Sequence, residues 1–323
     1  MKYRRLGAAG VKVSEISLGG WLTFQSADAR LRGQAVIDQA FDSGINFYDT
    51  ANVYGGGICE RNWGELLARY RRSSFVLATK VYFPMGDGPN DRGLSRKHIM
   101  EQCHASLDRL GTDYIDLYQC HRHDEDTPLE ETVRAMDDLI RQGKVLYWGY
   151  SMWPAGLIEE TFALCERRGY AAPVSSQPKY NLLIREIEAK VMPVSHAGGA
   201  GQVVFCPLEQ GLLTGKYGVD RPPPEGSRAL DEESNMFMKD LLGSRAVLEA
   251  IDGLRPLAEA AGCSLAQLAL AWILRRPEIS SCITGATRPE QVVENAAASG
   301  IGLDDGLVAR VEALMAPVGY TGI

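Results

Sequence analysis

Short apolar runs alternate with amphipathic stretches along nearly the whole chain. Runs of about four to eight residues rich in Val, Ile and aromatic residues are typical of buried strands, whereas apolar residues three and four apart are typical of helices. Strands are expected at about residues 15–19, 45–49, 74–80, 114–121, 145–151, 174–177, 202–206 and 280–284. Strands that alternate with helices in this way predict an α/β fold, a (β/α)8 TIM barrel whose strand carboxyl ends all open on one face.

Helical periodicity fills the intervals between these strands. Residues 3–13 alternate in polarity around Gly7 and Gly10, which predicts an N-terminal β-hairpin that covers the closed end of the barrel. Residues 208–240 are expected to form a long irregular segment on the open face. The whole chain, residues 1–323, is therefore expected to be one barrel domain. Helices are expected at about residues 30–43, 59–70, 95–111, 128–142, 154–168, 185–196, 244–261, 264–276 and 289–298.

Four chemically distinct side chains stand at or just beyond three consecutive strand ends. Asp49, Lys80 and His121 end the second, third and fourth predicted strands, and Tyr54 follows Asp49 beside the glycine run 55–57. Because the carboxyl ends of parallel barrel strands meet on one face, we expect these four side chains to converge there.

The four side chains together suit proton donation to a carbonyl oxygen. A tyrosine has a pKa of about 10, and a neighbouring ammonium favours the phenolate, so Lys80 is expected to bring the pKa of Tyr54 toward neutrality. Asp49 would keep Lys80 charged, and a neutral His121 would orient the oxygen. The hydride must come from a cofactor, because side chains cannot supply it. The alternative is a structural Asp49–Lys80 salt bridge beside an ordinary loop tyrosine; the clustering at consecutive strand ends favours catalysis.

Composition narrows the class of protein. The chain has 323 residues, of which 45% are hydrophobic, and a net charge of −7 without a block of basic residues, so a nucleic-acid partner is not expected. Its cysteines number seven, an odd count, and none are spaced C-x-x-C, which favours reduced thiols over a disulfide framework. No apolar signal core or membrane-length apolar run is present, and a soluble cytoplasmic protein without membrane insertion is expected.

Several other features compete for a functional interpretation. Residues 211–216 resemble a phosphate loop, but the glycine spacing is one residue short and Tyr217 stands where a Ser or Thr would bind magnesium. No G-x-G-x-x-G follows a predicted strand, so a Rossmann domain is not supported. The pair His121 and His123 leaves a metal site open, although one active-site imidazole and one loop histidine are favoured and no metal is expected. Trp63 and Trp272 are expected in the core, and Trp21 in a pocket.

At these residues the chain resembles the aldo-keto reductase family over nearly its whole length. The motifs that carry the resemblance are Gly44-Ile-Asn-Phe-Tyr-Asp49-Thr-Ala-Asn-Val-Tyr54, Ala78-Thr79-Lys80, Leu110-Gly-Thr-Asp-Tyr-Ile-Asp116-Leu117, Ser176-Gln177, Pro207-Leu208, Gly285-Ala286-Thr287 and Glu294-Asn295. Within the family, residues 92–99, 131–136 and 147–149 are most similar to voltage-gated potassium channel β subunits and their bacterial relatives.

The resemblance implies an extended nicotinamide cofactor, usually NADPH, on the open face. It assigns catalysis to Asp49, Tyr54, Lys80 and His121, and a substrate pocket to Trp21, Tyr54, Phe83 and His121. Gly20 and Trp21 would flank the nicotinamide, and Arg288 would meet a 2′-phosphate. The full implied set of cofactor residues is Gly20, Trp21, Asp49, Ser151, Gln177, Phe205, Cys206, Pro207, Leu208, Lys216, Arg228, Gly285, Thr287, Arg288, Gln291, Glu294 and Asn295.

Three positions depart from the common pattern of the family. Met152 replaces an asparagine that contacts the nicotinamide, Phe205 replaces a Tyr or Trp that stacks on it, and Cys206 replaces a serine. Animal channel subunits carry asparagine at the position of His121, so the complete set of four here favours catalysis.

The resulting expectation is an NADPH-dependent aldo-keto reductase that reduces aldehydes or ketones to alcohols with Tyr54 as general acid. One alternative is a redox-sensing regulatory subunit like the channel β subunits, and another is NAD(P)-dependent oxidation of an alcohol or sugar by the same groups in reverse. The resemblance also implies a homo-tetramer or octamer, by analogy alone.

Overall fold

The molecule is built on a closed barrel of parallel strands. The computed structural model describes residues 1–26, 28–232, 235 and 238–319. The strands are joined in the order β10-β3-β4-β5-β6-β7-β8-β9, and β1 and β2 form a separate antiparallel hairpin. The bounds are β1 (Tyr3–Arg5), β2 (Lys12–Ser14), β3 (Ile16–Gly19), β4 (Phe47–Asp49), β5 (Val76–Val81), β6 (Ile115–Cys120), β7 (Val145–Ser151), β8 (Ser175–Gln177), β9 (Gly201–Val204) and β10 (Ile279–Thr284). The predicted barrel and hairpin are confirmed.

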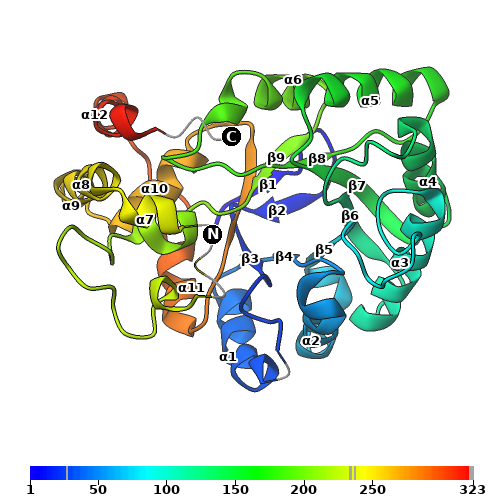
Figure 1. The fold of residues 1–323 in the computed structure, drawn as a ribbon, viewed down its shortest axis with the longest axis horizontal. Coiled ribbons are helices and arrows are strands. Elements are labelled where there is room, and N and C mark those ends of the chain that lie inside the picture. The colour runs from blue at the N-terminus through cyan, green and yellow to red at the C-terminus, as the bar shows by residue number, and fades with distance from the viewer. Residues whose placement is uncertain (27, 233–234, 236–237, 320–323) are drawn as a thin grey trace.

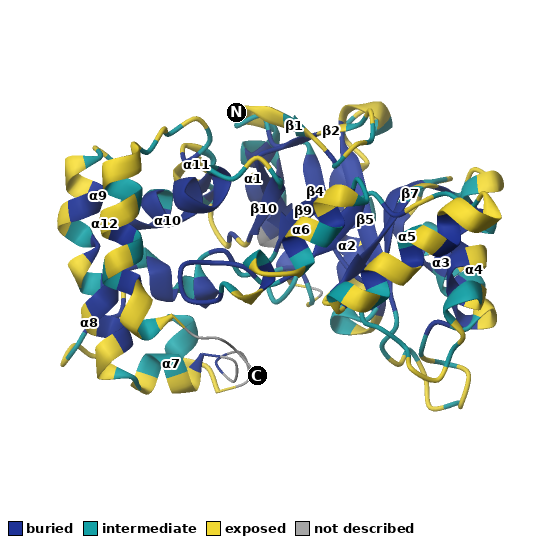
Figure 2. Cartoon of the chain, turned by 90° about the horizontal axis from the view of Figure 1, so that it is seen from above, coloured by how far each residue is buried: buried dark blue, intermediate teal, exposed yellow. Residues whose placement is uncertain are grey.

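Helices surround the barrel (Figure 1). Those that alternate with the first strands are α1 (Ala29–Asp42), α2 (Ile58–Leu67), α3 (Arg96–Leu110), α4 (Leu129–Arg141), α5 (Ala155–Arg168) and α6 (Val191–Ala197). Between β9 and β10 lie α7 (Lys239–Gly243), α8 (Arg245–Gly253), α9 (Arg255–Ala260) and α10 (Leu265–Leu274), and β10 is followed by α11 (Pro289–Ala296) and α12 (Asp305–Met315). Helices α8, α9 and α12 lie together beside the barrel (Figure 2).

The core has two parts, inside and outside the strands. The interior cluster comprises Leu6, Val13, Phe47, Val76, Ala78, Leu117, Val203 and Ile283. Leu6 and Val13 come from the hairpin, which therefore fills the closed end of the barrel, as expected. The larger part of the core lies between strands and helices and holds Trp63 and Trp272, both fully buried, which confirms the prediction for these two tryptophans.

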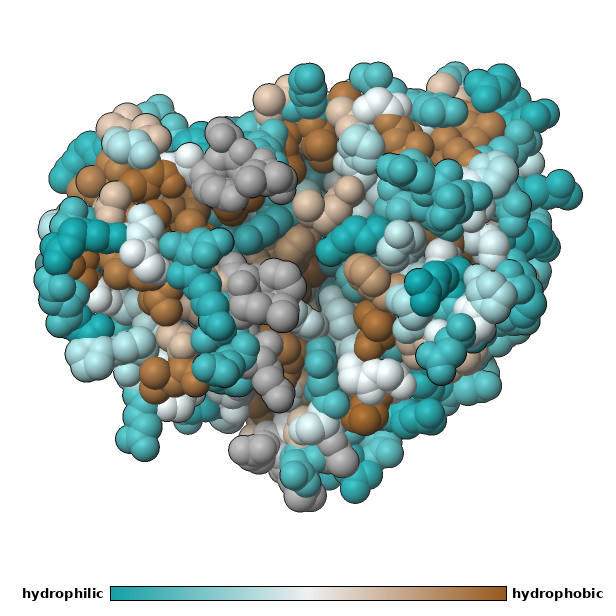
Figure 3. Space-filling model, in the orientation of Figure 1, coloured by the Kyte–Doolittle hydropathy of each residue, from teal (hydrophilic) through white to brown (hydrophobic). Residues whose placement is uncertain are grey.

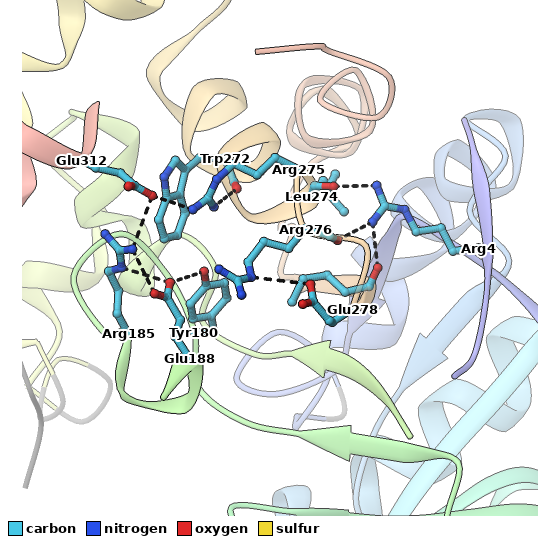
Figure 4. A network of polar contacts seen from close by, with 11 residues as sticks. Arg4, Tyr180, Arg185, Glu188, Trp272, Leu274, Arg275, Arg276, Glu278 and Glu312 are labelled. Carbon is cyan, nitrogen blue, oxygen red and sulfur yellow. Dashed lines mark hydrogen bonds and ion pairs between the residues drawn. The ribbon is translucent and has the colours of Figure 1, made fainter. Parts of the chain in front are cut away.

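A polar network fixes the hairpin and the last helices to the same end of the molecule (Figure 4). Arg4 donates to the main-chain oxygens of Leu274 (2.6 Å), Arg276 and Ile279 (both 2.9 Å), and its Nε lies 2.7 Å from Glu15 Oε1. Two of these acceptors lie at or just after the carboxyl end of α10, where main-chain oxygens lack helical partners. Arg4 of the hairpin thus donates hydrogen bonds to main-chain oxygens at the end of a helix about 270 residues away in sequence.

The same network anchors α12. Arg275 donates to Glu312 of α12 at 2.6 Å, and Arg185 lies 3.4 Å from the same carboxylate. The ring of Trp272 lies between the two guanidinium groups, 4.0 Å from Arg275 and 5.0 Å from Arg185. A helix that the sequence reading had not predicted is therefore held by charge and cation–π contacts to the buried α10.

Two helix predictions and one prediction of an irregular segment need correction. The helix expected at 185–196 is a 3₁₀ turn, η3 (Glu186–Glu188), followed by the short α6, because Pro193 is tolerated only in the first turn of a helix. The single helix expected at 244–261 is divided into α8 and α9, since Pro256 lacks an N–H to bond the oxygen of Asp252. The segment 208–240, expected to be irregular throughout, contains the turns η4 (Glu209–Thr214) and η5 (Arg228–Leu230) and the start of α7.

In the described part of the chain, no single helix combines the length and apolar character needed to cross a membrane. One pair of segments, Arg245–Ala260 and Leu265–Leu274, has the length and apolar composition of a membrane span when the two are taken together, but the pair is bent by 84°.

Candidate active site

A fully buried ion pair joins the ends of two adjacent strands. Asp49 is the last residue of β4, and Lys80 lies on β5, which pairs with β4 in parallel register. Lys80 Nζ lies 2.5 Å from Asp49 Oδ1 and donates to the main-chain oxygen of Thr50 at 2.8 Å. The second carboxylate oxygen of Asp49 accepts from Gln177 Nε2 at 2.9 Å. The carboxylate thus has a partner on each oxygen, which a buried charge requires.

Tyr54 reaches this pair from a tight turn. It begins η1 (Tyr54–Gly57), in which Gly55, Gly56 and Gly57 adopt left-handed backbone angles. A Cβ on Gly55 would lie 2.6 Å from the main-chain oxygen of Gln25, so only glycine fits there. The turn places the Tyr54 ring with its centroid 5.2 Å from Lys80 Nζ. The glycine run therefore allows the tight turn that positions Tyr54 over the strand ends.

His121 completes the expected group of four. It follows β6 directly, is buried, and its ring lies edge-on to Tyr54 (centroids 5.8 Å apart) and to Phe83 (4.8 Å). Burial, with the nearby charges of Lys80 and Arg122, lowers the pKa of His121 well below its ordinary value, so the imidazole is neutral at pH 7. Its Nδ1 is buried and has no hydrogen-bond partner among the described residues.

The expected effect of Lys80 on Tyr54 is not what the structure shows. Burial raises the pKa of Tyr54 well above its ordinary value, and the Asp49 carboxylate acts in the same direction. Burial also lowers the pKa of Lys80, against the attraction of Asp49. Because the ammonium is paired with a carboxylate 2.5 Å away, the pair brings little net positive charge to the phenol. Tyr54 therefore carries its proton at neutral pH, which a proton donor must do.

The first strand end presents Gly20 and Trp21 to this group. Gly20 N–H donates to the main-chain oxygen of Asp49 at 2.8 Å. A Cβ on Gly20 would lie 2.3 Å from Trp63 Nε1 and 2.5 Å from Cys59 Sγ, so the backbone passes close over α2. Trp21 follows directly and is partly exposed. The structure thus places Gly20 against the main chain of Asp49, with Trp21 next to it in sequence, and the contact of either residue with a ligand remains a prediction.

The residues expected to hold a carboxamide lie on neighbouring strands but already have partners. Ser151 ends β7, and its Oγ donates to the main-chain oxygen of Gln177 at 2.8 Å. Gln177 ends β8, and its amide nitrogen is the donor to Asp49. Met152 is exposed and adopts φ 56°. The sequence pattern did not predict that Gln177 links the expected cofactor edge of the barrel to the Asp49 carboxylate.

The segment after β9 has an unusual backbone. Cys206, Glu209 and Gln210 adopt φ between 42° and 54°, where a side chain is strained, and Gly211 adopts φ 99°. Phe205 packs against the interior cluster of the barrel, and Pro207 is buried beside the partly exposed Leu208. Strain of this kind persists only where the surrounding structure fixes it.

Two residues that sequence reasoning missed fix this segment. Asn181 Nδ2 donates to the main-chain oxygen of Cys206 (2.9 Å) and to Glu209 Oε2 (2.6 Å), while Lys179 Nζ lies 2.8 Å from Glu209 Oε1. Glu209 is fully buried. In the sequence, the only sign of this contact is a lysine and an asparagine shortly after a strand end. Their partner Glu209 lies about 28 residues further along, so the sequence pattern does not reveal the contact.

The remaining predicted cofactor residues form a basic and polar rim around β9 and β10. Lys216 and Arg288 are exposed and Arg228 is partly buried. Gly285 follows β10, and Thr287 donates from its N–H (2.7 Å) and its hydroxyl (3.1 Å) to Gln291 Oε1 at the start of α11. Glu294 Oε1 accepts from Ser264 at 2.9 Å, and Asn295 is buried. In the orientation of Figure 1 the molecular surface is hollowed near its centre (Figure 3).

Within the described residues, no group of three or more His, Cys, Asp or Glu side chains is placed to hold a metal ion. His123 lies near Trp153, with ring centroids 6.0 Å apart, and His121 lies against Tyr54 and Phe83. The described geometry therefore offers no cluster in which these two histidines act as metal ligands.

A closed barrel with a Lys–Asp pair, a tyrosine and an imidazole at its strand ends is the arrangement that the resemblance implied. The aldo/keto reductase family model matches residues 15–316, and the chain belongs to this family. It is 42% identical over 298 residues to a protein of Oryza sativa subsp. japonica named probable voltage-gated potassium channel subunit beta, an alignment that covers 91% of this chain and 90% of the rice protein.

Two further relatives carry similar names. An Arabidopsis thaliana protein, also named probable voltage-gated potassium channel subunit beta, is 42% identical over 298 residues, with 91% and 90% of the two chains covered. A Schizosaccharomyces pombe protein, named putative voltage-gated potassium channel subunit beta, is 41% identical over 301 residues, with 91% of this chain and 86% of that protein covered. The predicted family and the similarity to the channel β-subunit group are confirmed.

Proposed function

We propose that this protein is an NADPH-dependent reductase of aldehydes or ketones in which Tyr54 donates the proton. The observation that carries the proposal is the contact of a protonated, partly buried Tyr54 with the Lys80–Asp49 pair and a neutral His121. Membership of the aldo/keto reductase family supports an oxidoreductase.

The residues on the open face fit a dinucleotide with phosphate groups. Three cations, Lys216, Arg228 and Arg288, lie after β9 and β10, and none of them forms an ion pair with another residue that the structure describes. A Cβ on Gly211 would lie 2.9 Å from Lys216 Nζ, so the glycine allows the Lys216 ammonium to lie close to the main chain there. We propose that these cations hold the phosphates, that Phe205 lies against the nicotinamide, and that Arg288 favours NADPH over NADH.

The bound cofactor would supply a hydride to the carbonyl carbon. The side chains of the protein would supply the proton and orient the carbonyl oxygen. Tyr54 would give its proton to the carbonyl oxygen as negative charge develops there. The neutral His121 would hydrogen-bond the same oxygen and fix its direction. The ammonium of Lys80, paired with Asp49 and 5.2 Å from the centroid of the Tyr54 ring, would lie beside the phenolate that remains. Because Asp49 and Lys80 have little exposed surface, water would be kept from the ion pair while the proton is transferred.

The test is the Tyr54→Phe variant, which removes the hydroxyl and keeps the ring. A general acid typically contributes about 10²–10⁴-fold in rate, so kcat for a good carbonyl substrate should fall by that range. Binding of NADPH, followed by intrinsic fluorescence, should be nearly unchanged. Wild-type turnover in the variant, with a deuteride isotope effect showing that chemistry limits the rate, would exclude Tyr54 as the acid.

A regulatory subunit that retains cofactor and turns over slowly is the second candidate function, and the names of the three relatives favour it. The two functions differ in single-turnover rate. A bound-cofactor oxidation much slower than product release would favour the regulatory function, whereas rapid oxidation by a small carbonyl compound would favour the enzyme. A tetrameric or octameric assembly stays a prediction for either function.

A further inference from the structure

Arg122 is a half-buried cation that the proposed chemistry does not use. It directly follows His121 after β6. Its Nη1 donates to the main-chain oxygen of His121 at 2.5 Å, and its guanidinium carbon lies 5.4 Å from the centroid of the Phe83 ring. Among the residues that the structure describes, no carboxylate lies within ion-pair distance of this guanidinium. Most of its five N–H donors therefore have no acceptor among the described residues.

Other partly buried arginines of this molecule do have carboxylate partners. Arg72 pairs with Asp116 at 2.6 Å, Arg109 with Glu60 at 2.6 Å, and Arg275 with Glu312 at 2.6 Å. An unpaired cation withdrawn from water is unfavourable, and burial accordingly lowers the pKa of Arg122. Among the described residues Arg228 is likewise partly buried without an ion pair, but it is already one of the cations proposed to hold the cofactor's phosphates. Arg122 has no such assignment, and it calls for an anion that is not part of the described chain.

The nearest acidic residue along the sequence is committed elsewhere. Asp124 Oδ2 accepts from the N–H of Leu94 (2.6 Å) and from Thr127 Oγ1 (2.7 Å), and its Oδ1 accepts from the N–H of Asp126 (3.2 Å). These bonds shape the loop after β6 and leave Arg122 without an internal counter-charge.

The Arg122 guanidinium lies beside residues of the proposed active site. The rings of Tyr54, His121 and Phe83 form a row, with centroids 5.8 Å apart and then 4.8 Å apart, and the guanidinium lies at the Phe83 end of that row. Its charge acts on Tyr54, Lys80 and His121, which places it within electrostatic reach of all three.

The phosphates of the cofactor are not the expected counter-charge. The cations proposed to bind them lie after β9 and at the start of α11, which follows β10. In the closed barrel β6 is separated from β9 by β7 and β8, and from β10 by β5, β4 and β3. Arg122 is therefore on the opposite side of the barrel, where a substrate rather than a dinucleotide phosphate would lie.

We propose that Arg122 anchors an anionic substrate, and that the carbonyl compounds reduced here carry a carboxylate a few atoms from the reacting carbon. The inference rests on the proposed reductase function. The carbonyl oxygen would lie at Tyr54 and His121, the aliphatic connection would pass over Phe83, and the carboxylate would pair with the guanidinium, which matches carboxylate geometry through paired N–H donors.

The experiment compares short ω-oxo carboxylates, of about three to six carbons, with their methyl esters as matched neutral carbonyls. For the wild-type protein kcat/KM should be higher for the acid than for the ester, with an optimum in chain length. In Arg122→Gln the acid-to-ester ratio should fall about ten- to a hundred-fold, as expected for loss of a charged hydrogen-bonded contact. Arg122→Lys should lose less, and Arg134→Gln, at an exposed position on α4, should keep the wild-type ratio.

A second measurement does not depend on turnover. Calorimetric titration of the protein–NADPH complex with a saturated dicarboxylate such as glutarate should show binding that Arg122→Gln abolishes. An unchanged acid-to-ester ratio in Arg122→Gln, or glutarate binding that does not depend on Arg122, would overturn the inference while carbonyl reduction stands. Absence of reduction of acids and esters alike would overturn the proposed function, and glutarate binding would then decide the anion site by itself.

Discussion

At the scale of single residues, Lys80 is the position at which a buried charge depends most on its partners. Its ammonium has no exposed surface and depends on Asp49 and one main-chain oxygen for compensation. Removal of one partner from a buried ion pair typically costs about 3–5 kcal/mol, because the other charge remains buried. Lys80→Met should therefore lower the free energy of unfolding by about that amount, measured by urea denaturation.

The matched control for this prediction is the double variant Lys80→Met with Asp49→Asn, which removes both charges. It should recover part of the lost stability, since no isolated charge is left in the barrel. A double variant less stable than Lys80→Met alone would show that Asp49 is compensated by Gln177 and Gln119 rather than by the lysine.

His121 should make stability depend on pH. Its folded pKa is lowered by burial, so below about pH 6.5, the ordinary pKa of histidine, the unfolded state binds a proton that the folded state does not. Stability should therefore be complete above that pH and decline as the pH falls. His121→Asn should flatten the decline, measured as urea midpoints between about pH 5 and 8. Equal slopes for the wild type and the variant would contradict this account.

The sequence was sufficient to predict which residues meet at the open face, because a strand end fixes where its last side chain lies. It was not sufficient to predict the direction of the pKa shift of Tyr54. That shift depends on how deeply the ring is buried and on Asp49 neutralising Lys80. Arg122, Asn181 and Glu209 were also missed, since their significance lies in partners that are present or absent in space.

At the scale of elements, α12 shows how a helix end contributes to stability. Asp304 is its N-cap residue, and the carboxylate accepts from the N–H of Leu307 at 2.8 Å. Loss of such a cap typically costs about 0.5–2 kcal/mol. Asp304→Ala should lower the free energy of unfolding by that amount in chemical denaturation, whereas Asp304→Ser, which keeps an acceptor, should lose less. Equal losses in both variants would exclude capping as the cause.

The same helix shows why the spacing of apolar residues does not predict every helix. Only Val311 and Met315 of α12 are buried, so its apolar stripe is narrow and gives a weak pattern. The boundary between α8 and α9 and the short length of α6 were missed for a different reason. There, apolar spacing continues across a proline, and the backbone cannot follow it.

At the scale of the whole molecule, Arg4 connects the N-terminal hairpin strand β1 to the carboxyl end of α10 and the start of β10. Arg4→Met would leave several main-chain oxygens and Glu15 without their cationic partner. The expected loss of unfolding free energy is on the order of 3 kcal/mol. Because Arg4 lies at the closed end, NADPH binding and turnover below the unfolding transition should be retained. Loss of cofactor binding at low temperature would show that the two ends of the barrel are coupled.

The pairing of β10 with β3 also sets the order of events during synthesis. Ser17 Oγ bonds the main-chain oxygen of Cys282, 265 residues later, and β10 supplies the partner for both β3 and β9. Until residue 284 has emerged from the ribosome, the nascent sheet has two unpaired edges, and such edges readily pair with other chains. The barrel therefore cannot close during most of its translation, and protection of those edges by chaperones should govern its yield in the cell.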